Sequence, residues 1–390
     1  METEQIKINL KFANDYNKST NYLTHNFHPY ACKFIPQVPR DLISQLTREG
    51  DTILDPFCGS GTTLVEAKLL NRNAIGVDLN PIATLISEVK TTKLTLKEIE
   101  SIRGLLSKIK KEIQAYYQNG KSGKIYNIPD LNNLQHWFQT NVLNELGIIK
   151  AYTESVKDKK LKNYLFMALS AIIVNVSNQE SDTRFAAIKK DIKPFETYLK
   201  FSRKLDDMNK RMAEFIERSS DSKVSIFTAD SRNLSFLKDN SIDLIVTSPP
   251  YANTYDYYLY HKLRMYWIGY QVKPVQTNEI GSRNRHSSKK EDISMYIEDL
   301  SKCLNEMGRV LKKNKFAIII IGDSVIRGKL IRANKLMKEI AIKNNFKFID
   351  EISYNLKKSS RMFNQKFTNK TKLEYVIIFK NIKCGKCSSR

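Results

Sequence analysis

Residues 51–78, DTILDPFCGSGTTLVEAKLLNRNAIGVD, decide the fold of this chain. The stretch begins with a short apolar run at 51–54 and passes through a glycine-containing turn into a helical segment at 62–70. It ends in a second apolar run at 74–78, which closes on an acid. A strand, a helix and a strand in this order are typical of the start of a parallel sheet. We therefore expect an α/β fold.

Further apolar runs of strand length follow in the second half of the chain, and they complete the sheet. They lie at 224–227, 242–246, 316–321, 346–352 and 373–379. Together with the first two runs they predict about seven strands, with helices between most of them. The last two runs are expected to pair antiparallel, joined by a basic connection at 357–372.

The middle of the chain has a helical period instead. Between residues 96 and 117 the apolar residues recur at steps of three and four, which is typical of an amphipathic helix. Similar segments follow at 142–156, 161–175 and 195–218. The sequence therefore predicts a mainly helical insertion over residues 90–220.

The turn after the first strand has the composition of a cofactor site. Gly59 and Gly61 allow a tight turn and a close backbone approach to a ligand. A dinucleotide fingerprint is incomplete because Leu64 stands where its third glycine would fall, and no phosphate-loop lysine follows. Asp78 ends the next strand, where a carboxylate receives ribose hydroxyls. This pattern favours a cofactor with a nucleoside but no essential pyrophosphate.

A second turn, residues 247–251 (TSPPY), follows another predicted strand. Pro249 and Pro250 fix the backbone and direct the neighbouring carbonyls. With Ser248 in front and Tyr251 behind, the turn could accept hydrogen bonds from an exocyclic amino group and stack on a flat base. Taken alone, the segment could equally be an ordinary proline-rich turn.

Together, residues 55–63 (DPFCGSGTT) and 247–251 resemble the S-adenosylmethionine-dependent DNA amino-methyltransferases. The Ser-Pro-Pro-Tyr form is most similar to the N4-cytosine group. Residues 27–36 (FHPYACKFIP) are similar to the segment that supports the cofactor in this family. The resemblance implies a Rossmann-like methyltransferase sheet over 27–89 and 221–381. It leaves 1–26 as a polar arm, 90–220 as the candidate target-recognition region and 382–390 as a tail.

The resemblance also implies residue roles. Asp55 and the loop at 59–61 would hold the amino-acid part of S-adenosylmethionine, Asp78 its ribose, and Asp230 its adenine amino group. The implied cofactor-binding residues are Lys33, Phe34, Asp55, Phe57, Gly59, Gly61, Thr62, Asp78, Asp230, Ser231 and Thr247. Ser248, Pro249, Pro250 and Tyr251 would form the catalytic clamp on the target base. We therefore expect Gly61 and Tyr251 to line adjoining halves of one crevice.

The positive net charge of the chain favours a nucleic acid as its binding partner. The chain has 64 Lys and Arg against 41 Asp and Glu, a net charge of +23, which suits a phosphate backbone. Basic stretches without acids lie at 282–290 and 357–372, and a polar segment that we interpret as a surface loop lies at 179–185. From these segments we expect double-stranded DNA to be contacted by Arg184, Arg283, Arg285, Lys289, Lys358, Arg361 and Lys366.

Several classes are disfavoured. No apolar run is long enough to span a membrane, and the polar N-terminus lacks a secretory core. Five scattered cysteines argue for a reducing cytoplasm, and the resemblance implies a bacterial or archaeal cell, in which the protein would associate with the nucleoid through DNA. Cys384 and Cys387 have metal-ligand spacing but form a single pair near the terminus, so we expect no metal site.

The sequence thus predicts N4-cytosine methylation of DNA at a short recognition site, with a cognate restriction endonuclease as a candidate partner. The glycine turn precedes the clamp, whereas a permuted order is common among N4-cytosine enzymes, so N6-adenine methylation remains an alternative. Two others remain: a tRNA guanine-N2 methyltransferase, and a DNA-binding homologue without transfer activity.

Overall fold

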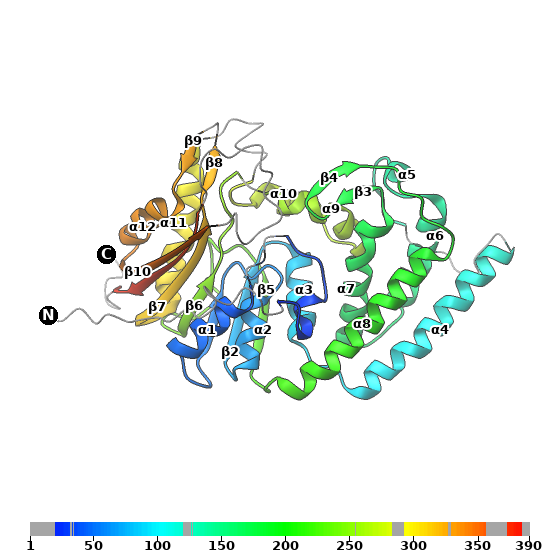
Figure 1. Ribbon diagram of the computed structural model, residues 1–390, viewed down its shortest axis with the longest axis horizontal. Helices are drawn as coiled ribbons and strands as arrows, with labels where there is room; N and C mark the ends of the chain where they lie inside the picture. Colours follow the sequence, from blue (N-terminus) through cyan, green and yellow to red (C-terminus); the bar gives the residue numbers. More distant parts are fainter. Residues whose placement is uncertain are drawn as a thin grey trace.

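The computed structural model describes residues 20–31, 33, 35–119, 126, 128–253, 255–282, 292–326, 329–355 and 373–383. A seven-stranded sheet with the strand order β10-β11-β7-β6-β1-β2-β5 forms its centre (Figure 1). The strands are β1 (Thr52–Asp55), β2 (Asn73–Asp78), β5 (Val224–Thr228), β6 (Ile242–Thr247), β7 (Leu311–Gly322), β10 (Phe346–Asn355) and β11 (Leu373–Asn381). The predicted α/β sheet is confirmed, as is the antiparallel pairing of its last two strands.

The order of the strands creates a crevice at the centre of the sheet. β1 pairs in parallel with β2 on one side and with β6 on the other. The chain runs outward from β1 through β2 to β5 and then returns to β6, so the direction of winding changes between β1 and β6. Open parallel sheets bind ligands at the carboxyl ends of the strands at such a point. The turns after β1 and β6 therefore meet at this edge.

Helices cover both faces of the sheet. One face carries α1 (Gln37–Leu46) and α2 (Thr62–Leu69), and the other carries α11 (Ile293–Val310) and α12 (Ala333–Lys343). β7 shows why the residues of a central strand are apolar on both sides. Ile318 and Ile320 are buried in the core under α1 and α2. Ile319 and Ile321 alternate with them and are buried under α11 and α12, as the two-residue period of a strand requires.

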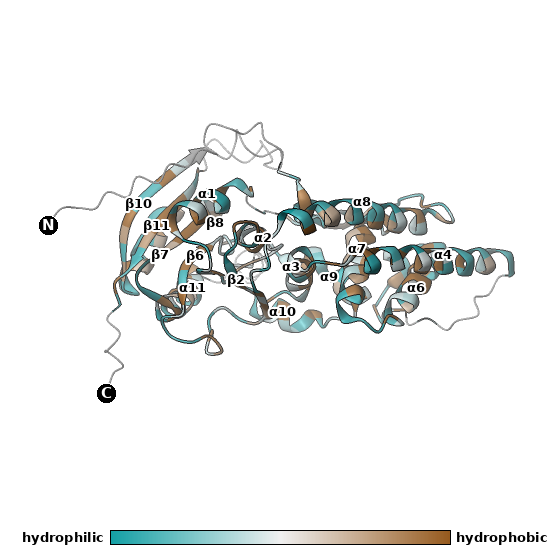
Figure 2. Cartoon of the chain, turned by 90° about the horizontal axis from the view of Figure 1, so that it is seen from below, coloured by the Kyte–Doolittle hydropathy of each residue, from teal (hydrophilic) through white to brown (hydrophobic). Residues whose placement is uncertain are grey.

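Residues 96–218 extend away from the sheet as a group of helices, with α4, α7 and α8 labelled along it in Figure 2. Each of the four predicted helices appears within two residues of its expected ends. They are α4 (Leu96–Asn119), α6 (Thr140–Glu154), α7 (Lys159–Val176) and α8 (Glu196–Arg218), and a short helix that was not predicted, α5 (Leu134–Trp137), lies between the first two. Their apolar sides share one continuous core with α3 (Pro81–Thr91), which follows β2, and with α9 (Tyr257–Ile268). The helical region is therefore packed firmly onto the sheet part of the molecule.

Two segments differ from the sequence expectation. Residues 179–185, expected as a surface loop, form most of an antiparallel hairpin of β3 (Gln179–Ser181) and β4 (Arg184–Ala187). Such short strands carry too few residues for a period of two to be recognised. The end of the expected polar arm forms a 3-10 helix, η2 (Leu23–Asn26), in which Leu23 and His25 are buried.

The remaining elements lie beside the crevice or near its edge. They are the helix α10 (Val272–Asn278) and a second hairpin of β8 (Ser324–Ile326) and β9 (Lys329–Ile331). Figure 1 shows the hairpins β3–β4 and β8–β9 at the same edge of the molecule, with α9 and α10 between them. Within the described part of the chain, no helix has the length and apolar character needed to cross a membrane.

Candidate active site

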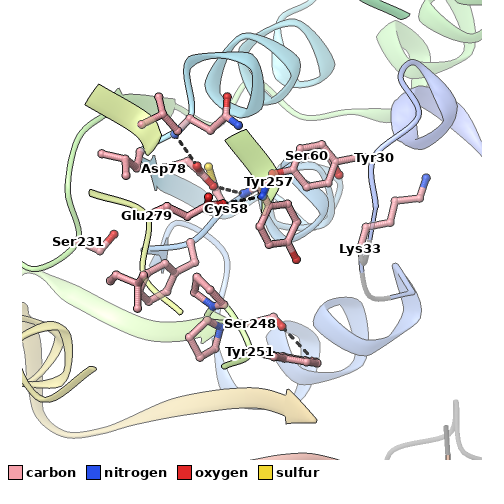
Figure 3. Close-up of a pocket in the computed structure, with 18 of the residues that line it drawn as sticks. Tyr30, Lys33, Cys58, Ser60, Asp78, Ser231, Ser248, Tyr251, Tyr257 and Glu279 are labelled. Atoms are coloured by element: carbon pink, nitrogen blue, oxygen red, sulfur yellow. Dashed lines mark hydrogen bonds between the residues drawn. The ribbon is translucent and has the colours of Figure 1, made fainter. Parts of the chain in front are cut away.

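A cavity lies at the carboxyl ends of β1, β2 and β6, and Figure 3 shows it in close-up. The turn after β1, the acid that ends β2, the turn after β5 and the turn after β6 all contribute to it. The predicted site residues that line it are Lys33, Phe57, Gly59, Thr62, Asp78, Asp230, Ser231, Ser248, Pro249, Pro250 and Tyr251. The structure thus brings the glycine turn and the proline turn, far apart in the sequence, to one cavity.

Gly61 does not itself line this cavity, although its neighbours Ser60 and Thr62 do. It caps α2 with a φ of +75°, and a Cβ added there would lie 2.7 Å from Ser87 Oγ of α3. The same serine donates a hydrogen bond of 2.9 Å to the Gly59 carbonyl. The Lys90 ammonium donates one of 2.6 Å to the Ser60 carbonyl. The close approach that requires glycine at position 61 is therefore that of α3.

Asp78 stands at the edge of the cavity with a fixed orientation. Its Oδ2 accepts a hydrogen bond of 2.9 Å from the Gly59 amide, and its Oδ1 accepts one of 2.8 Å from the Asn80 amide. Burial raises the pKa of Asp78 to about 6, against these two hydrogen bonds, which lower it. At neutral pH the carboxylate is ionised and has lone pairs left to accept hydroxyl groups.

Asp55 has a different role from the expected one. It is buried beneath the cavity surface and, like Thr247, is not among the lining residues. The Thr247 hydroxyl donates a hydrogen bond of 2.7 Å to Asp55 Oδ1, and the Phe57 amide donates one of 3.2 Å to the same oxygen. Burial raises the pKa of Asp55 to about 6, while the hydrogen bond from Thr247 lowers it. Asp55 thus ties the turn after β1 to the end of β6.

Three elements position the proline turn. The Tyr251 hydroxyl donates a hydrogen bond of 2.6 Å to Glu374 Oε1 of β11 and lies 3.5 Å from Ser248 Oγ. The Tyr296 hydroxyl of α11 donates one of 2.8 Å to the Pro250 carbonyl. With Thr247 held by Asp55, the turn is fixed at both ends before any ligand binds.

The turn after β5 supplies Asp230 and Ser231. Both oxygens of Asp230 accept hydrogen bonds of 3.0 Å from Arg232 Nε, and Asp230 Oδ2 lies 2.6 Å from Arg232 Nη2. Asp230 is therefore neutralised by an ion pair. The Ser231 hydroxyl donates to the Pro56 carbonyl and so joins this turn to the turn after β1.

The N-terminal segment forms another edge of the cavity. Lys33 lines it and donates a hydrogen bond of 3.1 Å to the His25 carbonyl. Tyr30 also lines it, and its ring stacks on that of Tyr257 with 6.1 Å between ring centroids and 20° between ring planes. Phe34 lies outside the described residues.

The sequence predicts only part of the wall formed by Tyr30, Tyr257 and the end of α10. The run of aromatic residues between 255 and 267, directly after the clamp, is expected to form one wall of the base pocket, with some of its members in the core. The aromatic run after the clamp is mostly core, since Tyr258, Tyr260 and Trp267 are buried, whereas Tyr257 reaches the cavity. The lining residues that the sequence does not single out are Cys58, Leu79, Asn80, Val275, Asn278, Glu279 and Ile280. The residues of this list beyond position 250 belong to no motif. They reach the cavity because the tertiary packing of α9 and α10 brings them there.

Three buried polar atoms in this lining have no hydrogen-bond partner among the residues that the structure describes: Ser60 Oγ, Asn80 Nδ2 and Glu279 Oε2. Buried polar groups are ordinarily paired, so a cluster of unpaired ones indicates a polar ligand. The lining also offers the aromatic rings of Phe57, Tyr30 and Tyr257. Polar atoms beside aromatic surface and an oriented carboxylate fit a nucleoside-bearing cofactor such as S-adenosylmethionine.

One of the predicted DNA contacts lies within the described residues. Arg184 lies on β4 with its side chain exposed, forms an ion pair of 3.0 Å with Glu180 and does not line the cavity. The other predicted contacts, and the Cys384 and Cys387 pair, lie outside the described residues: Arg283, Arg285, Lys289, Lys358, Arg361 and Lys366. In the part of the chain that is described, no three His, Cys, Asp or Glu side chains are grouped so as to hold a metal ion.

Comparison with known proteins gives a consistent result. A model of the N6/N4 methyltransferase family, described as DNA methylase, matches residues 5–88 and 242–383, more than half of the chain. The type II methyltransferase M.MvaI of Kocuria varians is 25% identical, over 88% of this chain and 86% of that protein. The type II methyltransferase M.MjaII of Methanocaldococcus jannaschii is 25% identical, over 77% of this chain and 72% of that protein. A solved S-adenosylmethionine-dependent methyltransferase from Methanosarcina mazei is 11% identical, covering 87% of this chain and 97% of that chain, with a TM-score of 0.35.

Proposed function

Because the chain belongs to the N6/N4 DNA methylase family, we propose that it transfers a methyl group from S-adenosylmethionine to the N4 amino group of a cytosine in double-stranded DNA. The names of its relatives as type II methyltransferases support a setting beside a restriction endonuclease, with a short recognition sequence. The observation that carries the proposal is that Ser248 and Tyr251 line the same cavity as Gly59 and Asp78. Serine at the first position of the tetrad supports cytosine as the target.

The chemistry needs placement more than strong acid or base catalysis. When bound, the cofactor supplies a methyl group that its sulfonium has already activated. The lone pair of an aromatic amino nitrogen is delocalised into the ring, so the nitrogen must become pyramidal to attack. Ser248 Oγ and the Pro249 carbonyl are the acceptors that would bind the two amino hydrogens and favour that geometry. Their turn is already fixed by Asp55, Tyr296 and Glu374, which lowers the cost of orientation.

A base inside a duplex cannot reach a cavity at the edge of the sheet, so the target nucleotide must leave the helix. Tyr251 offers the ring on which an extruded base would stack. The opposite side of the cavity, formed by Gly59, Ser60 and Asp78, would hold the cofactor. Figure 3 shows Asp78 and Tyr251 on opposite sides of the cavity.

Recognition of the DNA sequence is assigned in this proposal to the helical region, residues 90–220. Its hairpin β3–β4 stands at the same edge of the molecule as α9 and α10 (Figure 1), which contribute Tyr257 and Val275 to the lining of the cavity. Exposed Arg184 on that hairpin would contact phosphate. The basic segments 282–290 and 357–372 would add further phosphate contacts.

The test is a direct identification of the product. The purified chain is incubated with S-adenosylmethionine and double-stranded DNA, the DNA is digested to nucleosides, and the modified nucleoside is identified by mass spectrometry. We expect N4-methylcytosine. A matched sample with Ser248→Ala should give far less product with an unchanged cofactor affinity. Modification-sensitive sequencing of genomic DNA from cells that express the chain would then give the recognition sequence.

Other outcomes distinguish the alternatives. N6-methyladenine in the digest would reassign the target to adenine and keep the rest of the proposal. Methylation of tRNA at guanine N2, with none of DNA, would replace it. Cofactor binding without product on either nucleic acid would indicate a homologue that has lost transfer activity.

A further inference from the structure

Glu279, the residue directly after α10, projects a carboxyl group into the cavity from the wall that no motif predicts. Its side chain is buried, and its Oε1 accepts a hydrogen bond of 2.7 Å from the Tyr257 amide at the start of α9. Its Oε2 accepts no hydrogen bond from any residue in the described part of the chain. One oxygen therefore anchors the group and orients the other, which is left for a ligand.

The charges of the lining explain what kind of ligand Glu279 suits. The cavity is lined by three acids, Asp78, Asp230 and Glu279, and by one lysine, Lys33. Asp230 is paired with Arg232. Among the described residues neither Asp78 nor Glu279 forms an ion pair, and Figure 3 shows both on the side of the cavity away from Ser248 and Tyr251. A buried acid beside a half-buried one, neither of them in an ion pair among the described residues, is an unfavourable arrangement that a positively charged ligand relieves.

We propose that Glu279 is a cofactor-binding residue that supplies, with Asp78, the negative charge by which the site prefers the sulfonium cofactor to its uncharged thioether product. This inference rests on the proposed function and names a residue outside the two turns, 55–63 and 247–251, on which the resemblance was based. S-adenosylmethionine carries a positive sulfonium, whereas S-adenosylhomocysteine has lost that charge with the methyl group. Discrimination between them would favour uptake of the methyl donor and release of the spent product.

The ionisation of Glu279 supports this proposal. Burial, together with the neighbouring acids Asp256, before α9, and Asp78, at the end of β2, raises its pKa to about 8. Hydrogen bonds from the amides of Tyr257 and Tyr258 oppose this rise. Near neutral pH the empty site therefore holds the protonated acid. A cation bound nearby favours the carboxylate, so binding of the cofactor should release the proton from Glu279 to the buffer.

Isothermal titration calorimetry without DNA tests the proposal. Each ligand is titrated at pH 7.5 in phosphate and in Tris, whose different ionisation enthalpies report the number of protons released. For the unsubstituted chain we expect release of about 0.7 proton with S-adenosylmethionine. Release with S-adenosylhomocysteine should be smaller. Glu279→Gln keeps the acceptor for the Tyr257 amide, and it should abolish the release and weaken S-adenosylmethionine binding about tenfold while changing S-adenosylhomocysteine affinity less than about threefold.

The control is Glu298→Gln on α11, an exposed acid that pairs with Lys302 and does not line the cavity. It should leave affinities and proton release unchanged. Equal affinity and equal proton release in the unsubstituted chain and Glu279→Gln would overturn the proposal and leave DNA methylation untouched. If Glu279→Gln does not fold, the absence of proton release by the unsubstituted chain has the same force. Failure of that chain to bind either ligand overturns both this inference and the proposed function.

Discussion

The two sides of the cavity are built differently. The cofactor side comes from β1, its turn and the end of β2, which lie within residues 52–80 and are held by backbone contacts and by α3. The target side, after β6, depends on single hydrogen bonds from distant parts of the chain: Asp55, Tyr296 and Glu374. This difference indicates that substitutions on the cofactor side should mainly lower the free energy of unfolding. Substitutions on the target side should mainly lower the rate of methyl transfer, while the protein remains folded.

Gly61→Ala tests the cofactor side most severely. An added Cβ would lie 2.7 Å from Ser87 Oγ and 3.0 Å from Ser87 Cα, at a φ of +75°. Overpacking and backbone strain together should lower the free energy of unfolding by about 3 to 4 kcal/mol. Denaturant unfolding followed by circular dichroism measures this.

Gly269→Ala is the matched control. Gly269 also has a positive φ, +89°, but nothing lies within 4 Å of the added Cβ. Strain alone should cost about 1 kcal/mol there. Equal losses for the two variants would contradict the view that the packing of α3 against the turn fixes this side of the cavity.

The cofactor side of the cavity could be predicted from the sequence more fully than the target side. Residues 51–78 indicate a strand, a turn, a helix and an acid at fixed spacings, so the sequence alone assigns Gly59 and Asp78 to a ligand site. Periodicity likewise predicts α4, α6, α7 and α8, because long amphipathic helices repeat their pattern many times. The proline turn could be linked to the glycine turn by resemblance to a family.

The rest depended on tertiary packing. Glu279 carries no local pattern, and it reaches the cavity because α10 packs against α9. The resemblance predicts that Asp55 touches the cofactor, but strand pairing places it behind the surface, against Thr247. The hairpin β3–β4 is too short to show a period. Sequence patterns reveal neighbours along the chain, and they do not show which way a side chain faces after folding.

Thr247→Val tests the connection between the two sides. The variant keeps the side-chain shape but removes the donor of the 2.7 Å hydrogen bond to buried Asp55. Loss of a charge-assisted hydrogen bond in a buried site should cost about 2 kcal/mol of unfolding free energy at pH 8. The pKa of Asp55, already about 6, should rise further. The cost should therefore shrink as the pH falls below 6, where Asp55 is protonated.

Unfolding curves at pH 8 and pH 5.5 measure this difference. The control is Thr91→Val on α3, a buried threonine that donates 2.8 Å to the Ser87 carbonyl, a neutral acceptor. Its cost should not depend on pH. A cost for Thr247→Val that is the same at both pH values would show that Asp55 is not the group stabilised by this hydroxyl.

The pH dependence of cofactor affinity tests Asp78, and it is best measured in the Glu279→Gln background, where the other lining acid cannot titrate. Burial raises the pKa of Asp78 to about 6. Only the carboxylate accepts ribose hydroxyls on both oxygens, so binding should be strongest above pH 6. Below it, affinity should fall by about tenfold per pH unit, about 1.4 kcal/mol, as protonation competes with binding.

Calorimetric titrations at pH 5, 6 and 7 give the slope. Adding Asp78→Asn should flatten the profile. If the slope persists in the double variant, the acid responsible is another group, with Asp55 the nearest candidate by its pKa of about 6.

Tyr251→Phe should have the smallest effect and is the sharpest test of the target side. The ring needed for stacking remains, and only the hydroxyl that donates 2.6 Å to Glu374 Oε1 is lost. Loss of this positioning bond should reduce kcat about fivefold, about 1 kcal/mol, because the clamp is less well oriented for the amino group. The affinity for S-adenosylmethionine and the midpoint of unfolding should stay unchanged.

The control is Tyr258→Phe. Tyr258 is a buried tyrosine of α9 that does not line the cavity, so this substitution should leave kcat unaltered. A Tyr251→Phe variant with normal kcat but a lower unfolding midpoint would mean that the hydrogen bond to β11 stabilises the fold instead of orienting the clamp. That result would contradict the difference we infer between the two sides of the cavity.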